Sequence, residues 1–411
     1  MRIHTFTPLL GVLLVSMALS SSVHAASCEF HGGLYSSWEY TDNYRGTAHN
    51  QQSETIYEIG PSVDIICRAY PFALSLSGHA ARSYHNRFKD DDETEVDLIS
   101  GLTASSRRDS LELGYAFVQT SRSDLFSDVS GETRIHTGTL SYSRTLSPLT
   151  TLGLGYTRRL EDNSFPEQDI ESEGASASLS HRITPNNTVS LTAGYDRYDY
   201  EVSEDAQVLR SSLSFEHALS PRTDVGVDLE YQHQYREEDL PDSDIKAAYL
   251  FWGHALTPQT RVRLSGGYSW LSTEDADRQR AAVGRADFSS TWQRDVFTLT
   301  LSREYTAEFT TDEYGTYDVR RAAASWEREL LRSLSLLTTI TYVERKPVTG
   351  IDVSTGIGRQ EEKEITGLVS LSWSPIRFID ITSSYEHLRE DEEASDTVTE
   401  NRYRIIVEVL Y

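Results

Sequence analysis

The sequence predicts an all-β protein, folded as a single large antiparallel β-barrel that spans a membrane. Three observations carry this prediction: an alternating strand at the C-terminus, a hairpin-sized repeat through the middle, and a secretory leader at the N-terminus. After the leader, none of the apolar runs in the 411 residues approaches the roughly 20 residues that a membrane-spanning helix needs. We therefore expect the chain to cross the membrane with strands.

The N-terminus has the organisation of a secretory signal peptide. Met1–Arg2 open a short basic region, Leu9–Leu19 form a short apolar region, and Val23–Ala25 give the small-x-small pattern of a cleavage site. We predict that residues 1–25 are removed and that residues 26–411 form the barrel, in the outer membrane of a Gram-negative bacterium.

The last nine residues alternate between apolar and polar side chains, which is the pattern of a strand with two different faces. A chain that ends inside such a strand, on an aromatic residue, resembles the C-terminal signal of outer-membrane barrels. That resemblance implies that this strand closes the barrel and is read by the barrel-assembly machinery. The apolar row of this signal is Tyr403, Ile405, Val407, Val409 and Tyr411.

A Ser/Thr-Pro pair recurs at intervals of 37, 36 and 37 residues, at Pro148, Pro185, Pro221 and Pro258. Such a pair favours a tight turn, and each interval has room for one transmembrane hairpin. The count is about 20 strands, with 16–18 possible, and we expect both termini in the periplasm. Aromatic residues at fixed heights predict an interfacial belt, with these members: Tyr156, Tyr195, Tyr231, Tyr268 and Trp252.

Two strands, Val225–Tyr235 and Val262–Trp270, show an apolar row opposite a small or charged row. The polar row is expected to line a wet lumen of mixed charge, because barrels of this size leave an aqueous interior. The lumen-facing polar residues predicted in this way are Asp228, Glu230, Arg261, Arg263 and Arg404. Arg303 falls on the lipid-facing row, so we expect it near the rim or beside a bulge.

The sequence contains 63 acidic and 38 basic residues, a net charge of −25, which argues against a nucleic-acid partner. No nucleophile elbow, zinc-binding helix or phosphate loop is present, so we predict no catalytic residues, no metal and no cofactor. His181, His217 and His254 lie on alternate strands, too far apart for one zinc ion, and are interpreted as belt residues. The longer connections are acidic and are expected to face lipopolysaccharide.

Cys28 and Cys67 are the only two cysteines. Antiparallel pairing of the first two strands would place them side by side at the periplasmic rim, within reach of a disulfide in an oxidising compartment. Lipidation of Cys28 is the alternative, but the residues before it lack the usual lipobox leucine or valine.

The opening strand ends in Tyr40-Thr41-Asp42-Asn43. This ending resembles the β-barrel porin-2 group, and also barrels associated with PEP-CTERM and exopolysaccharide gene clusters. The resemblance implies an outer-membrane channel that passes polar solutes or exopolysaccharide, with polysaccharide-export components as partners. A non-transporting scaffold or adhesin remains the alternative, with Pro347–Gln360 as a loop that folds inward to block the lumen.

Overall fold

The computed structural model describes residues 27–120, 132–163, 169–200, 205–236, 242–273, 279–309, 314–349, 361–392 and 397–411. Within these ranges the chain forms 20 strands and one short 3-10 helix, η2 (Lys89–Asp91). The first ten strands are β1 (Ser27–Thr41), β2 (Glu54–Ala69), β3 (Phe72–His85), β4 (Thr94–Ser105), β5 (Asp109–Thr120), β6 (Thr133–Ser147), β7 (Thr150–Asn163), β8 (Ile170–Thr184), β9 (Asn187–Tyr200) and β10 (Ala206–Ser220). The others are β11 (Thr223–Arg236), β12 (Ser243–Thr257), β13 (Thr260–Thr273), β14 (Gln279–Trp292), β15 (Asp295–Phe309), β16 (Tyr314–Leu331), β17 (Leu334–Thr349), β18 (Glu362–Ile376), β19 (Ile379–Glu392) and β20 (Val398–Leu410).

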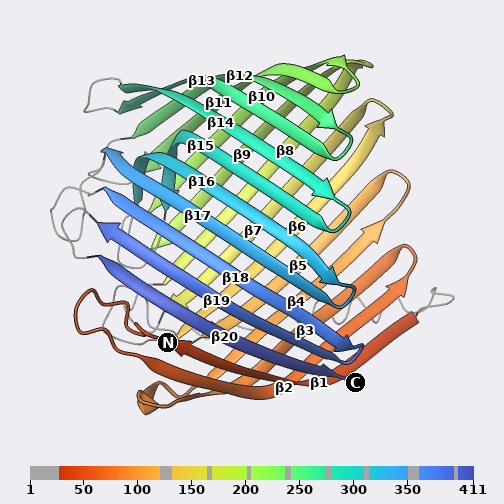
Figure 1. Cartoon of the computed structure of the whole chain (residues 1–411). Helices are drawn as coiled ribbons and strands as arrows, with labels where there is room; N and C mark the ends of the chain where they lie inside the picture. The colour runs from red at the N-terminus through yellow and green to blue at the C-terminus, as the bar shows by residue number, and fades with distance from the viewer. Residues whose placement is uncertain are drawn as a thin grey trace.

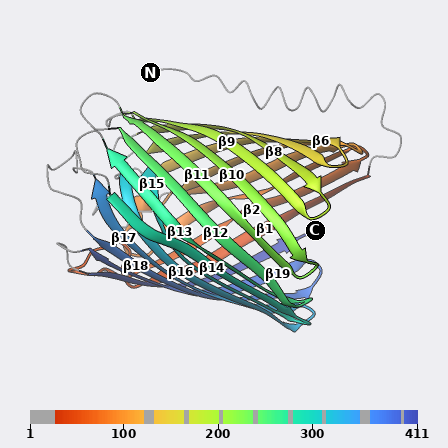
Figure 2. The same cartoon turned by 90° about the horizontal axis from the view of Figure 1, so that it is seen from above.

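The strands form one closed antiparallel barrel. Each strand pairs with its neighbours in sequence, and β20 pairs with β1 from Leu410 opposite Gly33 to Arg402 opposite Thr41. The closed wall and the tilt of its strands are visible in Figure 1 and, after a quarter turn, in Figure 2. The predicted all-β barrel of about 20 strands is therefore confirmed.

The two ends of the barrel have different connections. Each even-numbered strand from β2 to β18 is joined to the next strand by two or three residues. These short turns lie on the right-hand side of Figure 1. The longer connections, which include residues 42–53 and 86–93, lie at the opposite end. We call these the short-turn end and the long-loop end. The C-terminal residues of β20 lie at the short-turn end.

The repeated Ser/Thr-Pro pair has a local structural role at the short-turn end. The hydroxyl oxygen of Ser147, Thr184, Ser220 and Thr257 accepts a hydrogen bond from the backbone N–H two residues later, at 3.2–3.3 Å. This bond satisfies a backbone donor that the ladder leaves free in the turn. Each of these four hairpins also carries a register shift at the same place. The repeat therefore marks a turn structure built by the side chain before the proline.

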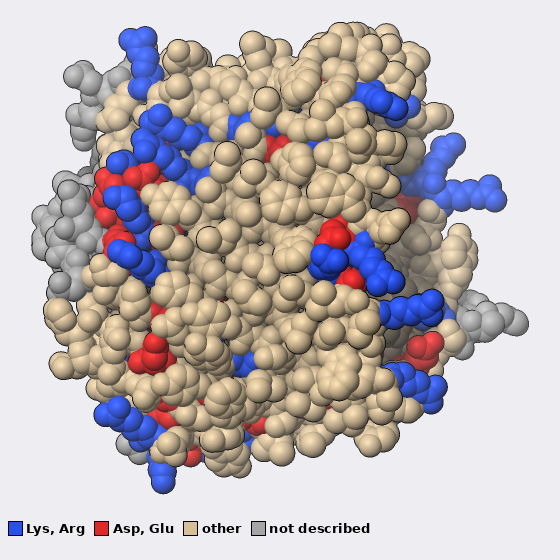
Figure 3. Space-filling view, viewed as in Figure 1, with Lys and Arg blue, Asp and Glu red and all other residues tan. Residues whose placement is uncertain are grey.

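The two faces of the wall differ as the alternation predicts. On β1, Tyr35, Ser37, Glu39 and Thr41 are buried, whereas Leu34 on the other row is 48% exposed. Tyr35, Glu58 and Arg404, from three strands, converge on the same side, which identifies that side as the interior. In Figure 3, charged side chains gather towards the two ends, and most of the zone between them is uncharged.

The five predicted belt residues all lie on the outward row of their strands by register. Tyr195 and Tyr268 are 40% and 58% exposed and lie in the halves of their strands nearer the long-loop end. Tyr156 lies near the middle of β7, and Trp252, which is 39% exposed, lies nearer the short-turn end. Tyr195, Tyr231 and Tyr268 thus share one position, each eight residues after the start of its strand, whereas Trp252 lies towards the opposite end of the wall.

Arg303 lies on the outward row, in a stretch where the pairing of β15 with β16 is regular. Its guanidinium donates two hydrogen bonds to the carboxylate of Asp318, at 2.8 and 3.0 Å. A two-bond pair of this kind neutralises the charge on the outer surface. In the structure, the cost of the exposed cation is reduced by this neighbour on β16 and not by a bulge.

The barrel narrows near the long-loop end. Thr316 Oγ1 on β16 donates a hydrogen bond to Gln234 Oε1 on β11, at 3.3 Å, although four strands separate β11 from β16 along the wall. Inward-facing apolar side chains in this region are almost completely buried: Leu271 is 1% exposed and Val319 is 1% exposed. The wall here is bent so that β11 and β16 approach each other across the interior.

Candidate functional site: the lumen wall

The predicted lumen-facing residues all lie on the inward row, but their environments differ. Arg261 pairs with Asp224 on β11 at 2.6 Å, and Arg263 lies 3.8 Å from Asp228. The Arg263 guanidinium also lies over the ring of Phe251, 4.0 Å from its centroid, in a cation–π arrangement. In the described part of the chain, Glu230 has no ion-pair partner.

Arg404 belongs to a network at the seam where the barrel closes. Its Nη2 donates to Tyr35 Oη at 2.9 Å and lies 3.2 Å from Glu58 Oε2. Glu58 is only 4% exposed and also accepts hydrogen bonds from Tyr35 and Ser37.

Arg402, two residues earlier, continues this network. It lies 3.3 Å from Glu39 and 2.8 Å from Glu400, which are 3% and 4% exposed. The seam of β1, β2 and β20 is therefore held on its inner side by buried, oppositely charged groups, in addition to the backbone ladder. The sequence identified Arg404 but none of these partners.

Residues 42–53 fold against the interior at the long-loop end. Tyr44 is 8% exposed, and its hydroxyl lies 3.2 Å from both His85 Nε2 and Asp91 Oδ2. His85 is on the inward row of β3, so this contact places Tyr44 over the mouth of the lumen. Burial, followed by the charge of Asp91, raises the pKa of the Tyr44 hydroxyl above its usual value.

Other contacts fix the same loops. Arg45 pairs with Asp91 at 3.3 Å and lies over the ring of Phe88, 4.6 Å from its centroid. The Glu54 carboxylate accepts hydrogen bonds from four backbone N–H groups, those of Thr55, Asn86, Arg87 and Phe88. The first loop is therefore an ordered part of the lumen entrance. The loop that the sequence suggested for this role falls mainly in 350–360, outside the described residues.

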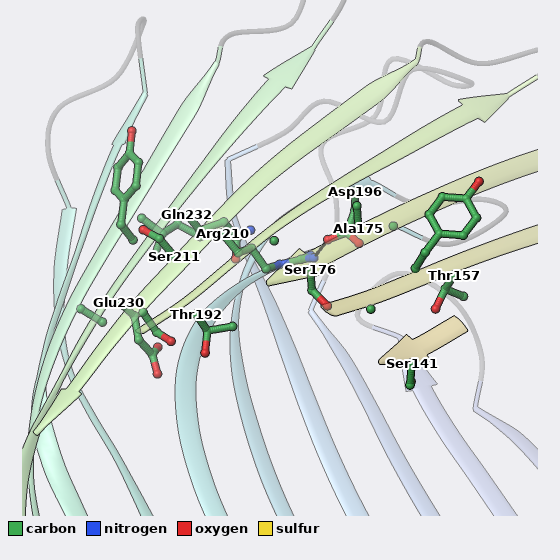
Figure 4. A pocket seen from close by; sticks show the side chains of 18 of the residues that line it. Ser141, Thr157, Ala175, Ser176, Thr192, Asp196, Arg210, Ser211, Glu230 and Gln232 are labelled. Carbon is green, nitrogen blue, oxygen red and sulfur yellow. Dashed lines mark hydrogen bonds and ion pairs between the residues drawn. The ribbon is translucent and has the colours of Figure 1, made fainter. Parts of the chain in front are cut away.

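A cavity of about 570 Å³ lies against the wall formed by β6 to β12. Figure 4 shows its inner lining of small hydroxyl-bearing side chains, with Asp196 and Arg210 directed towards each other. The inward lining residues that bear a hydroxyl group are Ser141, Thr157, Ser176, Thr192, Ser212 and Tyr249. Such a surface offers many donors and acceptors and little side-chain bulk.

The two cysteines face each other in the β1–β2 register and form a disulfide, with Cα atoms 4.0 Å apart. At the C-terminus, Tyr403, Ile405, Val407 and Val409 occupy the outward row of β20. The backbone of Tyr411 exchanges two hydrogen bonds with Gly32, at 2.8 and 3.1 Å. Its ring stacks on Phe378, 6.1 Å away.

His181, His217 and His254 lie on the outward rows of separate strands. The Nδ1 atom of each hydrogen-bonds to Thr150, Asn187 or Thr223 on a neighbouring strand, at 2.7–2.9 Å. Among the described residues, no three His, Cys, Asp or Glu side chains are grouped to hold a metal ion. The described helical segments likewise include none with the length and apolarity to span a bilayer.

No family model and no curated protein matches the chain. Among solved structures, the siderophore receptor PirA from Pseudomonas aeruginosa is similar, with a TM-score of 0.53 and 10% identity, over 94% of this chain and 81% of the receptor. A mutant of the ferric enterobactin receptor PfeA from the same organism gives a TM-score of 0.54 at 9% identity, over 94% and 82%. Pseudomonas aeruginosa OprD covers 95% of this chain and 97% of its own at 11% identity, with a TM-score of only 0.44. The two receptors support the large-barrel fold and nothing finer.

Proposed function

We propose that this protein is an outer-membrane channel that passes small polar solutes through the lumen of its barrel. The observation that carries the proposal is the difference between the two faces of one closed wall. The outward rows hold aromatic and aliphatic side chains such as Leu250, which is 68% exposed. The inward rows hold hydroxyls, carboxylates and guanidinium groups, which suit a water-filled interior.

The proposal includes the location and partners expected from the sequence. The leader directs the chain to the periplasm and is then removed, and the barrel-assembly machinery inserts the barrel with lipopolysaccharide around the long-loop end. The role of β20 as the strand that closes the barrel supports this, because its pairing with β1 continues to the two backbone hydrogen bonds between Tyr411 and Gly32.

The test is the conductance of the purified, folded protein in planar lipid bilayers. A channel gives discrete current steps of reproducible size. Heat-denatured protein from the same preparation is the control and should give none. A folded, heat-modifiable preparation that inserts but never conducts would exclude the channel.

Exopolysaccharide is the finer proposal for the solute, and it derives from the family resemblance. The hydroxyl-rich lining beside Asp196 and Arg210 supports a hydroxylated ligand, because these groups hydrogen-bond to sugars as readily as to water. Swelling of liposomes in isosmotic sugars of increasing size measures the cutoff. Entry of monosaccharides alone would support a small-solute channel and count against an exported polymer.

A non-transporting scaffold is the second candidate. The packing of Tyr44 over the mouth and the approach of Thr316 to Gln234 both narrow the interior, which favours this alternative. The same conductance measurement separates the two functions.

A further inference from the structure

The arginines of the lumen wall are mostly neutralised by neighbouring carboxylates. Inward-facing arginines on seven strands each lie within 4.0 Å of an Asp or Glu oxygen. They are Arg68, Arg159, Arg210, Arg261, Arg263, Arg285, Arg345, Arg402 and Arg404. Among the inward arginines whose side chains the structure describes, Arg182 and Arg321 lack such a pair. The basic groups therefore contribute little net positive charge to the lumen.

The inward-facing carboxylates that have no arginine or lysine partner outnumber the two unpaired arginines. In the ranges that the structure describes, those that form no ion pair include Asp64, Asp97, Glu112, Glu216, Glu230, Glu304, Glu327, Asp380 and Glu408. They are distributed over β2, β4, β5, β10, β11, β15, β16, β19 and β20. The charge that remains after pairing is therefore negative over most of the wall, whereas β6 to β9 contribute no unpaired carboxylate among the described residues.

Two of these carboxylates come together where the barrel narrows. Glu230 on β11 and Glu304 on β15 are close enough for their charges to interact, and Asp228 interacts with Glu230 as well. Tyr249 on β12 lies directly opposite Asp228 in the strand register, and all three carboxylates are near its hydroxyl group. The nearby cations Arg263 and Arg285 are already paired with Asp228 and Asp287. Carboxylates from β11 and β15 therefore face the same stretch of the lumen.

We propose that the lumen selects cations, and that Glu230, Glu304 and Asp228 form its acidic constriction. A ring of carboxylates lowers the free energy of a cation in a narrow passage and raises that of an anion. Low-dielectric walls strengthen this effect by focusing the field. The ring of Tyr249 adds a π-face suited to an organic ammonium group. The preferred solutes are therefore small cations, inorganic or organic, and not anionic sugars. The inference rests on the proposed channel and names its substrate class.

The reversal potential in a potassium chloride gradient measures the selectivity of the wild-type protein directly. A cation-selective pore makes the dilute side positive at zero current. The preference should weaken as both solutions are made more concentrated, because salt screens the fixed charges. A reversal potential near zero, or one of opposite sign, overturns the inference and leaves the channel intact. A complete lack of conductance overturns both.

The double variant Glu230→Lys, Glu304→Lys tests the location of the filter. It should abolish or invert the cation preference, whereas the neutral variant Glu230→Gln, Glu304→Gln should reduce it severalfold. Glu112→Lys is the matched control, because Glu112 is also inward-facing and unpaired but lies on β5, away from the constriction. Heat-modifiable migration verifies that each variant is folded. If Glu112→Lys changes the reversal potential as much as the double variant, the constriction is not the filter.

Discussion

At the scale of single residues, Glu58 shows how the inner face of the barrel is held together. Its carboxylate accepts hydrogen bonds from Tyr35, Ser37 and Arg404 and is only 4% exposed. Removing one partner of a buried charged pair leaves the other charge uncompensated, at a cost of about 3–5 kcal/mol. The pairing joins the first two strands to the last one, so its loss affects the seam.

We predict that Glu58→Gln weakens the closed barrel. Glutamine keeps the shape and the hydrogen-bond acceptor but loses the charge that Arg404 requires. The temperature at which the folded, fast-migrating form is lost on gels should fall clearly. Glu112→Gln, which neutralises an inward carboxylate without an ion pair, is the control and should change this temperature little. Equal shifts in the two variants would show that the seam network does not stabilise the barrel.

The residue scale also shows what the sequence could predict. Alternation placed Asp228, Glu230, Arg261, Arg263 and Arg404 on one face, because side chains of a strand point to opposite sides with period two. It gave no partners, since Arg404 and Glu58 are 346 residues apart in the chain. Which charges are neutralised depends on register between strands, and the periodicity of one strand does not contain that information.

At the scale of elements, the short turns were predictable and the entrance loop was not. Ser/Thr-Pro pairs determine a turn through a local bond, from a hydroxyl to an N–H two residues away. The packing of residues 42–53 depends on Tyr44 meeting His85 and Asp91, which come from another hairpin. The only sequence signal near this segment was the resemblance of Tyr40–Asn43 to a family of barrels.

We predict that Tyr44→Ala releases the first loop from the mouth and increases the mean conductance or the current noise. The substitution removes the hydroxyl contacts and the stacking on Phe88, whose ring centroid is 5.2 Å away. Ser53→Ala is the control, because Ser53 belongs to the same loop and its side chain is exposed. An unchanged conductance trace for Tyr44→Ala would show that the loop does not limit the passage.

The raised pKa of Tyr44 gives the contact a defined pH range. The stabilising contribution of the protonated hydroxyl is complete below the ordinary tyrosine pKa of about 10 and decreases as the pH rises towards the higher folded-state value. The Tyr44 hydroxyl should therefore stay protonated through neutral and mildly alkaline pH.

At the scale of the whole molecule, the sequence predicted the closed barrel and its strand number closely, because each hairpin carries its own turn and its own alternation. The narrowing between β11 and β16 was not predicted. It depends on the curvature of the complete wall, and Thr316 and Gln234 carry no local signal of it. The proposed filter at Glu230 and Glu304 depends on the same curvature, so its partners across the lumen could be identified only from the fold.

The orientation of the barrel follows from the asymmetry of its two ends. Outer-membrane barrels have short periplasmic turns and longer outer loops, and the chain has its short turns at the end where β20 finishes. We therefore predict that the long-loop end faces the outside and that the turns at Pro148, Pro185, Pro221 and Pro258 face the periplasm.

The variants Lys89→Cys and Gln259→Cys test this orientation, because both positions are exposed and lie at opposite ends of the barrel. A maleimide carried on a large polyethylene glycol should label Lys89→Cys on intact cells and Gln259→Cys only after lysis. The native cysteines, joined in a disulfide, provide the unreactive background. Labelling of Gln259→Cys alone on intact cells would reverse the orientation, and it would place the Tyr44 entrance on the periplasmic side.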